Sequence, residues 1–486
     1  MVWRRLLPAA IALSGVLWCQ APPPKPMKLG PLAVTGSLRL RAESWEWFQG
    51  DADNSYTYPG TILRLGLGQQ KKSYDWQVEL AAPILLGLPD NSIAPGAQGQ
   101  LGLGATYFAS NDRHRNTAMI FAKQAFVRFK NLGGSEAHSL RLGRFEFVDG
   151  AEVAPKNATL AALKRDRIGH RLIGNFVWSH VGRSLDGAHY LYNSGKNNVT
   201  VVGAQPTRGV FQTDGWGRMN TALGYAAFTR QAPWNKTNTG EWRLFALHYH
   251  DWRDVLKTDN RTTAARRADR GNIRVATFGG HYLHTADTSA GTCDFLLWGA
   301  VQTGRWGLLD HRAGAASIEG GYQPHVLPKL KPWFRAGYLY GSGDGNPNDQ
   351  EHKTFFQVLP PPRWYARFPF YNFMNNQDAF AALILRPHQS LSVRSEYHGL
   401  RLTDPNDLWY QGGGAFQPWS FGYQGRPSGG NRGLATLFEI SADYAVNPHV
   451  TLVGYFANAQ GKMVPGAIYP QGRDARLGYL ELGYRF

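Results

Sequence analysis

The sequence predicts an all-β fold, a transmembrane antiparallel up-and-down β-barrel of about eighteen strands, with sixteen as the alternative count. Three observations predict this fold. Apolar and polar residues alternate along much of the chain, and no window after Ala21 has enough consecutive apolar residues for a membrane helix. The composition is also rich in glycine and aromatic residues, with 56 Gly, 16 Trp, 22 Tyr and 25 Phe. Because only helices and closed sheets satisfy every backbone group in lipid, a membrane chain without such helices must form a barrel.

The first residues are predicted to be a targeting segment rather than part of the barrel. Arg4 and Arg5 form a basic start, and Leu6 to Leu17 is mainly apolar. A small-residue cleavage site then follows at Ala21, so residues 1–21 are interpreted as a secretory signal peptide. Removing it lowers the formal net charge from +17 to +15, because it contains two arginines and no acid.

The alternative interpretation of the leader is a lipoprotein signal with Cys19 acylated, but the bulky Trp18 before that cysteine argues against it. A proline-rich segment, 22–35, is expected to connect the signal peptide to the barrel at 36–486. If cleavage follows Ala21, Cys293 is the only cysteine left, so no internal disulfide can form.

The strand signal is period-2 alternation over about ten residues, typical of membrane strands. It is clear in three segments, 73–80, 389–402 and 434–444. Repetition of the pattern predicts strands near 36–48, 59–70, 73–81, 119–130, 138–147, 172–192, 198–205, 219–230, 240–250, 271–284, 292–304, 312–322, 331–341, 377–386, 389–402, 433–446, 449–459 and 474–486.

The connections between these strands provide a second test. Asn447-Pro448 and 386–388 are tight turns, whereas the long connections all fall on the alternate set, as expected for short turns on one side and long loops on the other. The long connections are 82–118, 148–171, 342–376 and 403–432.

The last predicted strand points to a location. Leu480, Leu482, Tyr484 and Phe486 share one face, and the chain ends on an aromatic residue. This pattern resembles the C-terminal signal that the barrel-assembly machinery recognises. Together with the signal peptide, it predicts the Gram-negative outer membrane, with lipid and lipopolysaccharide as partners.

If apolar residues face lipid, the polar residues on alternate positions face the interior. Arginine favours anions in a pore and binds carboxylates through its planar fork, so these residues are interpreted as an anion path. The alternative is that they pair with acids on neighbouring strands. The predicted pore-lining arginines are Arg39, Arg41, Arg64, Arg128, Arg141, Arg274, Arg335 and Arg394.

The loop at 148–171 is predicted to narrow the pore. Asn157 is a suitable N-cap for a short helix over 159–168, and a helix-bearing loop folded into the lumen would form a constriction. The alternative is that its cations lie outside and neutralise lipopolysaccharide phosphates. The four predicted constriction cations are Lys164, Arg165, Arg167 and Arg171.

One loop begins like a calcium site. Asp344, Asn346 and Asn348 place oxygen ligands at alternating positions, but the glycine and the bidentate acid that a complete calcium loop needs are replaced by Asp349 and Phe355. A structural calcium is therefore one interpretation and a plain polar turn the other. Otherwise no cofactor is expected. No nucleophile elbow, zinc-protease or Walker motif appears, so an enzyme is not expected.

Three motifs resemble those of the alginate-export outer-membrane porin family: 140–152, 164–174 and 342–347. The resemblance covers roughly 36–486 and implies an eighteen-stranded monomer whose arginine-rich lumen passes a polyuronate outward. The arginines of the first two motifs that it carries over are Arg141, Arg144, Arg165, Arg167 and Arg171. The resemblance also implies gating by an extracellular loop and a periplasmic loop, but the turn assignment leaves no long loop on the periplasmic side.

These observations predict a passive outer-membrane channel for anionic solutes, with an acidic polysaccharide such as alginate as one such solute. The basic net charge indicates anionic partners, and nucleic acid is excluded because no basic helix or zinc spacing accompanies a secreted chain. Two alternatives remain. One is a plugged barrel that acts as a surface binding or adhesion protein, and the other is a membrane-embedded lipid or glycan hydrolase.

Overall fold

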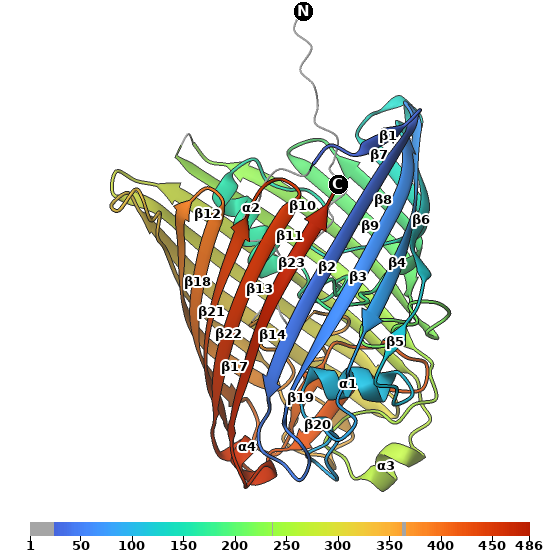
Figure 1. Cartoon of the computed structure of the whole chain (residues 1–486), viewed down its shortest axis with the longest axis vertical. Coiled ribbons are helices and arrows are strands. Elements are labelled where there is room, and N and C mark those ends of the chain that lie inside the picture. Colours follow the sequence, from blue (N-terminus) through green and yellow to red (C-terminus); the bar gives the residue numbers. More distant parts are fainter. Residues whose placement is uncertain (1–23, 236, 362–365) are drawn as a thin grey trace, which may run out of the picture.

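The computed structural model describes residues 24–235, 237–361 and 366–486, and in these ranges eighteen long strands form one closed antiparallel barrel (Figure 1). The barrel closes because β2 (Leu32–Glu46) pairs with both β3 (Ser55–Gln70) and β23 (Asp474–Arg485). The predicted fold class and the count of eighteen are confirmed. The predicted signal peptide lies outside the described residues. Strand β2 begins slightly earlier than expected.

The remaining wall strands follow in chain order, each pairing with the next. They are β4 (Tyr74–Leu85), β6 (Phe121–Lys130), β7 (His138–Phe145), β8 (Leu185–Asn193), β9 (Asn197–Pro206), β10 (Thr221–Pro233), β11 (Asn238–Asp251), β12 (Ile273–Asp287), β13 (Gly291–Trp306), β14 (Leu309–Pro324), β15 (Trp333–Gly341), β17 (Asn376–His388), β18 (Leu391–Leu402), β21 (Gly433–Ala445) and β22 (Val450–Gly461).

Short elements complete the structure. They are β1 (Met27–Leu29), β5 (Thr117–Ala118), β16 (Glu351–His352), the hairpin of β19 (Leu408–Gly412) and β20 (Tyr423–Pro427), the helices α1 (Leu103–Ser110), α2 (Ala158–Leu163), α3 (Thr263–Ala268) and α4 (Met463–Ile468), a 3₁₀ turn at Leu132–Gly134 and a π turn at Lys164–Ile168. None of the helices in the described ranges is long and apolar enough to cross a membrane.

The barrel seam explains why the chain ends on an aromatic residue. Gly36 and Phe486 exchange two backbone hydrogen bonds of 3.1 and 3.0 Å, which continue the β2–β23 ladder to the last residue. A Cβ atom at position 36 would lie 2.3 Å from the Phe486 ring. The Phe486 ring lies over Gly36 at the seam and would have to move to make space for a larger residue there.

Alternation along the wall separates an outer face from an inner one. On β3, for example, Leu63, Leu65 and Leu67 are exposed on the outside, whereas Ile62 and Arg64, at alternate positions, are buried inside. The C-terminus, strand β1 and the short turns lie at one end of the barrel, and the long connections lie at the other (Figure 1). The predicted asymmetry of the connections is therefore confirmed.

One predicted strand was wrong in its first half. The segment 172–192 was expected to be a single strand, but only Leu185–Asn193 is one. Residues 172–184 are buried inside the barrel instead, where Phe176 and Gly182 have positive φ angles of 57° and 71°. Their apolar residues face other apolar groups in the lumen rather than lipid, so a hydrophobic run looked like a membrane strand.

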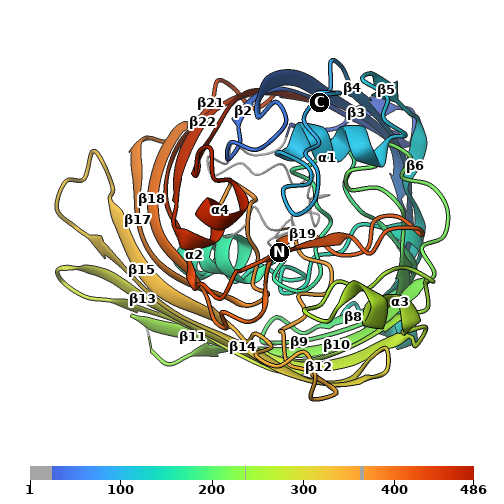
Figure 2. The same ribbon diagram turned by 90° about the horizontal axis from the view of Figure 1, so that it is seen from below.

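The predicted helix of this connection is present but shorter. The Asn157 side chain accepts a 3.0 Å hydrogen bond from the Leu160 amide and thereby caps α2. After Leu163 the helix continues as a π turn through Ile168. Figure 2, along the barrel, shows α1, α2 and the β19–β20 hairpin inside the ring of strands.

Candidate functional site

The barrel interior is largely filled by four connections from the end opposite the C-terminus, residues 86–120, 146–184, 342–361 with 366–375, and 403–432. They carry buried aromatic side chains that pack on the wall. Trp298 of β13 stacks on Phe373 with ring centroids 5.9 Å apart, and Trp306 of β13 stacks on His352 at 4.1 Å. These contacts attach the inner segments to the wall at β13.

Five of the eight predicted pore-lining arginines are held by wall carboxylates. In each case the guanidinium and its partner lie on the inner face of the sheet, and four of these five arginines are buried. This geometry matches the alternative that the residues pair across neighbouring strands. The pairs are Arg41 with Glu43 and Glu481, Arg64 with Glu79 and Glu146, Arg128 with Asp75, Arg335 with Asp294 and Glu319, and Arg394 with Glu396.

Two further arginines face the interior with other contacts. Arg39 donates to the carbonyls of Val177 and Ser179, and its Nε lies 3.8 Å from Glu481. Arg141 contacts Nδ1 of His189 at 2.9 Å, and its guanidinium lies over the Phe145 ring, 4.3 Å from the centroid.

Arg274 lies on the outer face, so its assignment to the pore was wrong. Its neighbours Ile273 and Val275 are 2% and 0% exposed and belong to the hydrophobic cluster inside the barrel, whereas Arg274 is exposed. The parity rule failed here because the interior at this level is apolar. Phe278, on the same face as Arg274, is also exposed.

Two of the predicted constriction cations converge on one wall acid. Arg167 and Arg171 each place a guanidinium nitrogen 2.7 Å from Glu319 of β14, and Arg335 approaches the same carboxylate to 3.2 Å. Glu319 is 1% exposed. We call Arg167, Arg171, Arg335 and Glu319 the Glu319 cluster. It attaches the 146–184 segment to the wall.

The other two constriction cations differ from each other. Lys164 is buried and lies 2.9 Å from Glu241 of β11. Burial lowers its pKa from the usual range. Arg165 is partly exposed and pairs with its neighbour Asp166 at 2.5 Å. All four cations lie inside the barrel, but in the described structure each is paired with an acid.

Arg183 joins three inner segments without any carboxylate. Its guanidinium donates to the carbonyls of Leu359, Gly413 and Ala415 at 3.0, 2.9 and 2.9 Å. The side chain is 1% exposed, and burial lowers its pKa to about 10. It is a structural cross-link between the segments that fill the lumen.

An open pocket remains toward the end that carries the C-terminus. It has a volume of about 90 Å³, and we call it the terminal pocket. Four cations and two acids line it, which leaves a formal net charge of +2 on its lining side chains. These charged residues are Arg39, Arg64, Lys123, Glu146, Glu481 and Arg485.

Lys123 is a lining residue that the sequence analysis missed. Strand β6 contains a bulge, because Glu79 of β4 pairs with Gln124 whereas Leu80 pairs with Ala122. The bulge shifts the alternation by one residue, so that Lys123 and Arg128 both face inward although their numbers differ in parity. No residue in the sequence marks this bulge.

The predicted calcium ligands form consecutive turns. Asp344 accepts a hydrogen bond from the Asn346 amide, and Asn346 accepts one from the Asn348 amide, both at 3.1 Å. Asp344 is buried, and burial raises its pKa to about 6. A calcium ion at these three residues stays a prediction, and two of their four side-chain oxygens already accept hydrogen bonds from backbone amides.

Comparison with known protein families places this chain among outer-membrane transport proteins. The sequence profile described as "Alginate export" matches residues 102–480. No curated protein sequence matches.

Solved structures share the fold at low sequence identity. OpdK of Pseudomonas aeruginosa is 10% identical, with a TM-score of 0.53 over 93% of this chain and 98% of its own. OccAB2 of Acinetobacter baumannii is 9% identical and OccK9 (OpdG) of P. aeruginosa 10% identical, each with a TM-score of 0.57 over 94% of this chain and 98% of its own.

Proposed function

Since this chain belongs to the alginate export family of Gram-negative outer-membrane channels, we propose that it is a passive channel for anionic solutes with its selective step at the terminal pocket. In such barrels the short turns lie on the periplasmic side, so the terminal pocket opens toward the periplasm. The carrying observation is the excess of cations over acids among its lining residues.

The balance of charge distinguishes this pocket from the rest of the interior. Most of the other predicted pore-lining arginines are held by acids, and Arg183 is held by backbone carbonyls, whereas here Arg39, Lys123 and Arg485 outnumber the acids that reach them. A narrow, net positive passage attracts anions and repels cations. Lys123 lies 3.6 Å from Glu146, and Arg39 lies 3.8 Å from Glu481, so neither pair is tight.

The filled lumen favours a small organic acid over a polymer in this conformation. A pocket of about 90 Å³ is small beside the usual ligand sites of 300 Å³ or more. Passage of a polyuronate requires the inner segments to move away from the wall. Among the structures of similar fold, OpdK has been crystallised with vanillate, an aromatic carboxylate.

Planar-bilayer recordings across a salt gradient test the proposal. The purified barrel should show a reversal potential of anion-selective sign, and Lys123→Gln should move it toward zero because the substitution halves the net charge of the pocket. Arg274→Gln is the matched control, since it removes a cation from the outer face and should leave the potential unchanged. Cation selectivity of the wild-type protein would overturn the proposal.

A second candidate function is a plugged barrel that binds a ligand through its surface loops. The observation that favours it is the dense aromatic packing of the inner segments. Deleting the hairpin segment 408–427 discriminates between the two, because a plugged barrel conducts only after the deletion whereas a channel conducts before it. The family and the similar structures are channels. The hydrolase alternative is not proposed, because no catalytic arrangement is recognised among the described residues.

A further inference from the structure

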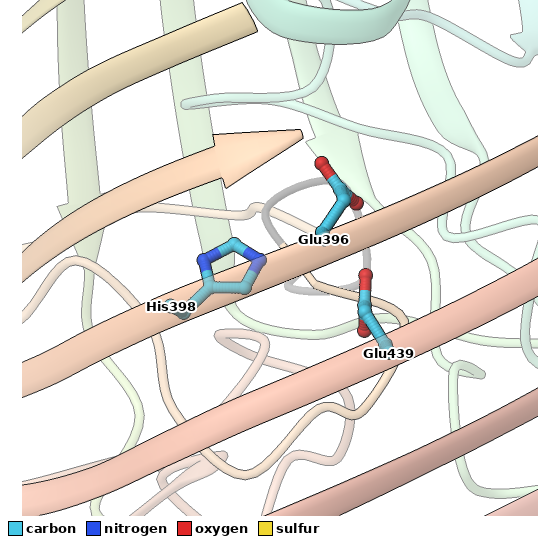
Figure 3. Close-up of side chains that lie close together, drawn as sticks. All are labelled: Glu396, His398 and Glu439. Atoms are coloured by element: carbon cyan, nitrogen blue, oxygen red, sulfur yellow. The ribbon is translucent and has the colours of Figure 1, made fainter. Parts of the chain in front are cut away.

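A cluster of acids and one histidine lies on the inner wall away from the terminal pocket. Glu396 and His398 are two residues apart on β18 and therefore share a face, and Glu439 lies directly opposite Glu396 on β21. All three are 3% exposed or less. One ligand atom of each lies within 4.8 Å of the others (Figure 3).

The position of the two glutamates is unfavourable without a balancing charge. Like charges directly opposite each other in an antiparallel pair destabilise the sheet, and burial strengthens the repulsion. Arg394 pairs with Glu396, while Glu439 accepts hydrogen bonds from the Tyr455 hydroxyl at 2.8 Å and the Arg367 amide at 3.0 Å. Neither of these last two donors carries the charge that would neutralise Glu439.

With its acids ionised and His398 neutral, the part of the cluster that the structure describes carries an excess of two negative charges. Glu396, Glu439 and Asp378 are acids, Arg394 is the cation paired among them, and a neutral His398 adds nothing. Two nearby cations of the described segments are already paired with other acids. Arg367 pairs with Asp443, and Arg167 pairs with Glu319.

The histidine is oriented as metal-binding histidines are. Both carboxylate oxygens of Asp378 lie 3.0 Å from Nδ1 of His398, and the Tyr371 hydroxyl donates to the same carboxylate at 3.0 Å. Nε2 of His398 is buried, has no hydrogen-bond partner among the described residues, and points toward the two glutamates (Figure 3). A histidine that binds a metal through one nitrogen usually donates its other N–H to a carboxylate.

From these observations we propose that Glu396, His398 and Glu439 form a buried site for a divalent transition-metal ion, with zinc as the best match. Two carboxylates and one imidazole are the ligand types that Zn²⁺ accepts, with water as a fourth ligand. Bonds of roughly 2.0 Å to each ligand bring the ligand atoms about 3.3 Å apart. Small side-chain rotations from the observed separation are enough, and the ion neutralises the two excess charges.

The site also lies where an inner segment meets the wall. Arg367 and Tyr371, both of the 366–375 segment, bond to Glu439 and Asp378 of the cluster. A bound ion therefore fixes the wall carboxylates that hold this segment, and its removal should lower the thermal stability of the barrel.

The test is metal binding by the full mature chain without a histidine tag, stripped with a chelator and titrated with Zn²⁺. One zinc per chain by mass spectrometry and calorimetry is expected, and Co²⁺ in its place should give the visible absorption of a low-coordinate site with nitrogen and oxygen ligands. Glu439→Gln and His398→Gln should each abolish this binding. Heat-modified migration on gels establishes that each variant is a folded barrel.

The matched control is His281→Gln, because His281 is also a buried wall histidine bonded to a glutamate, Glu241, but belongs to no such cluster. It should retain one zinc. Asp378→Asn should weaken zinc binding by about 10- to 100-fold, as loss of an orienting partner does. No zinc bound by the folded wild type, or equal binding by wild type and His398→Gln, would overturn the proposal.

Discussion

The Glu319 cluster and the terminal pocket contain the same kind of residue in opposite roles. In the cluster, Arg167, Arg171 and Arg335 surround one buried carboxylate at 2.7 to 3.2 Å. In the pocket, Arg39 and Lys123 lie 3.6 Å or more from the nearest acid and border open space. An inward arginine is therefore a structural clamp where buried acids or, as at Arg183, buried carbonyls hold it, and a candidate for solute contact where it borders open space.

The largest effect is expected when Glu319, the acid that the three arginines share, loses its charge. Glu319→Gln removes the carboxylate that Arg167 and Arg171 share, whereas Arg335 keeps its ion pair with Asp294. Breaking a buried ion pair by removing one partner costs about 3–5 kcal/mol. We expect the 146–184 segment to be released from the wall, with faster protease cleavage in that segment and a larger single-channel conductance.

Asp310→Asn is the control for this prediction. Asp310 pairs with Arg305 at 2.7 Å, but both side chains are more than half exposed. Exposed ion pairs contribute at most about 1 kcal/mol, so protease cleavage and conductance should stay unchanged. Equal behaviour of Glu319→Gln and wild type would show that the cluster does not hold the segment.

A second variant tests whether the buried arginines hold the other inner segments in the lumen as well as 146–184. Arg183→Met removes the three hydrogen bonds to the carbonyls of Leu359, Gly413 and Ala415. Each hydrogen bond to a charged group contributes about 1.5–3 kcal/mol at most. Part of this loss is offset if water enters and binds the three carbonyls that lose their donor. We expect frequent openings to a higher conductance, and a bilayer trace without them would contradict the cross-link.

The barrel could be predicted from the sequence because lipid imposes alternation on every strand. The terminal Phe486 and the lengths of the loops also indicated an outer-membrane barrel. The interior could not. Residues 172–184 and Ile273 face an apolar lumen, so hydrophobicity no longer distinguishes inside from outside there. The bulge at Lys123 shifted the parity by one residue. Pairing of Arg167 with Glu319 joins residues 152 positions apart, and no local pattern encodes it.

A pH series tests the stability of a different inner segment, 342–361, which contains the buried acid Asp344. Burial raises the pKa of Asp344 to about 6, above its value of about 3.9 in an unfolded chain. The folded state then binds the proton more tightly, so the stability of the 342–361 segment should rise as pH falls from 7 toward 4. Asp349 and Lys353 lie nearby and pair with each other at 2.6 Å.

Asp344→Asn isolates the contribution of Asp344 to this dependence. The amide keeps the hydrogen bond to the Asn346 backbone and places an uncharged group at the buried Oδ2 position. Protease sensitivity of the segment should depend less on pH over this range. Some dependence remains, because Asp407 accepts a hydrogen bond from the backbone amide of residue 344 and burial raises its pKa to about 7. An unchanged pH profile would assign the dependence to another group.

The smallest expected effect concerns the helix that carries the clamped cations. Asn157 caps α2 through one hydrogen bond to the Leu160 amide, and replacing such a cap with alanine costs about 1 kcal/mol. Because Arg167 and Arg171 still hold the segment on Glu319, Asn157→Ala should speed protease cleavage near 157 only slightly and leave conductance unchanged. Combined with Glu319→Gln, the same substitution should have a larger effect on conductance than it has alone, since the clamp that compensated for the lost cap is then absent.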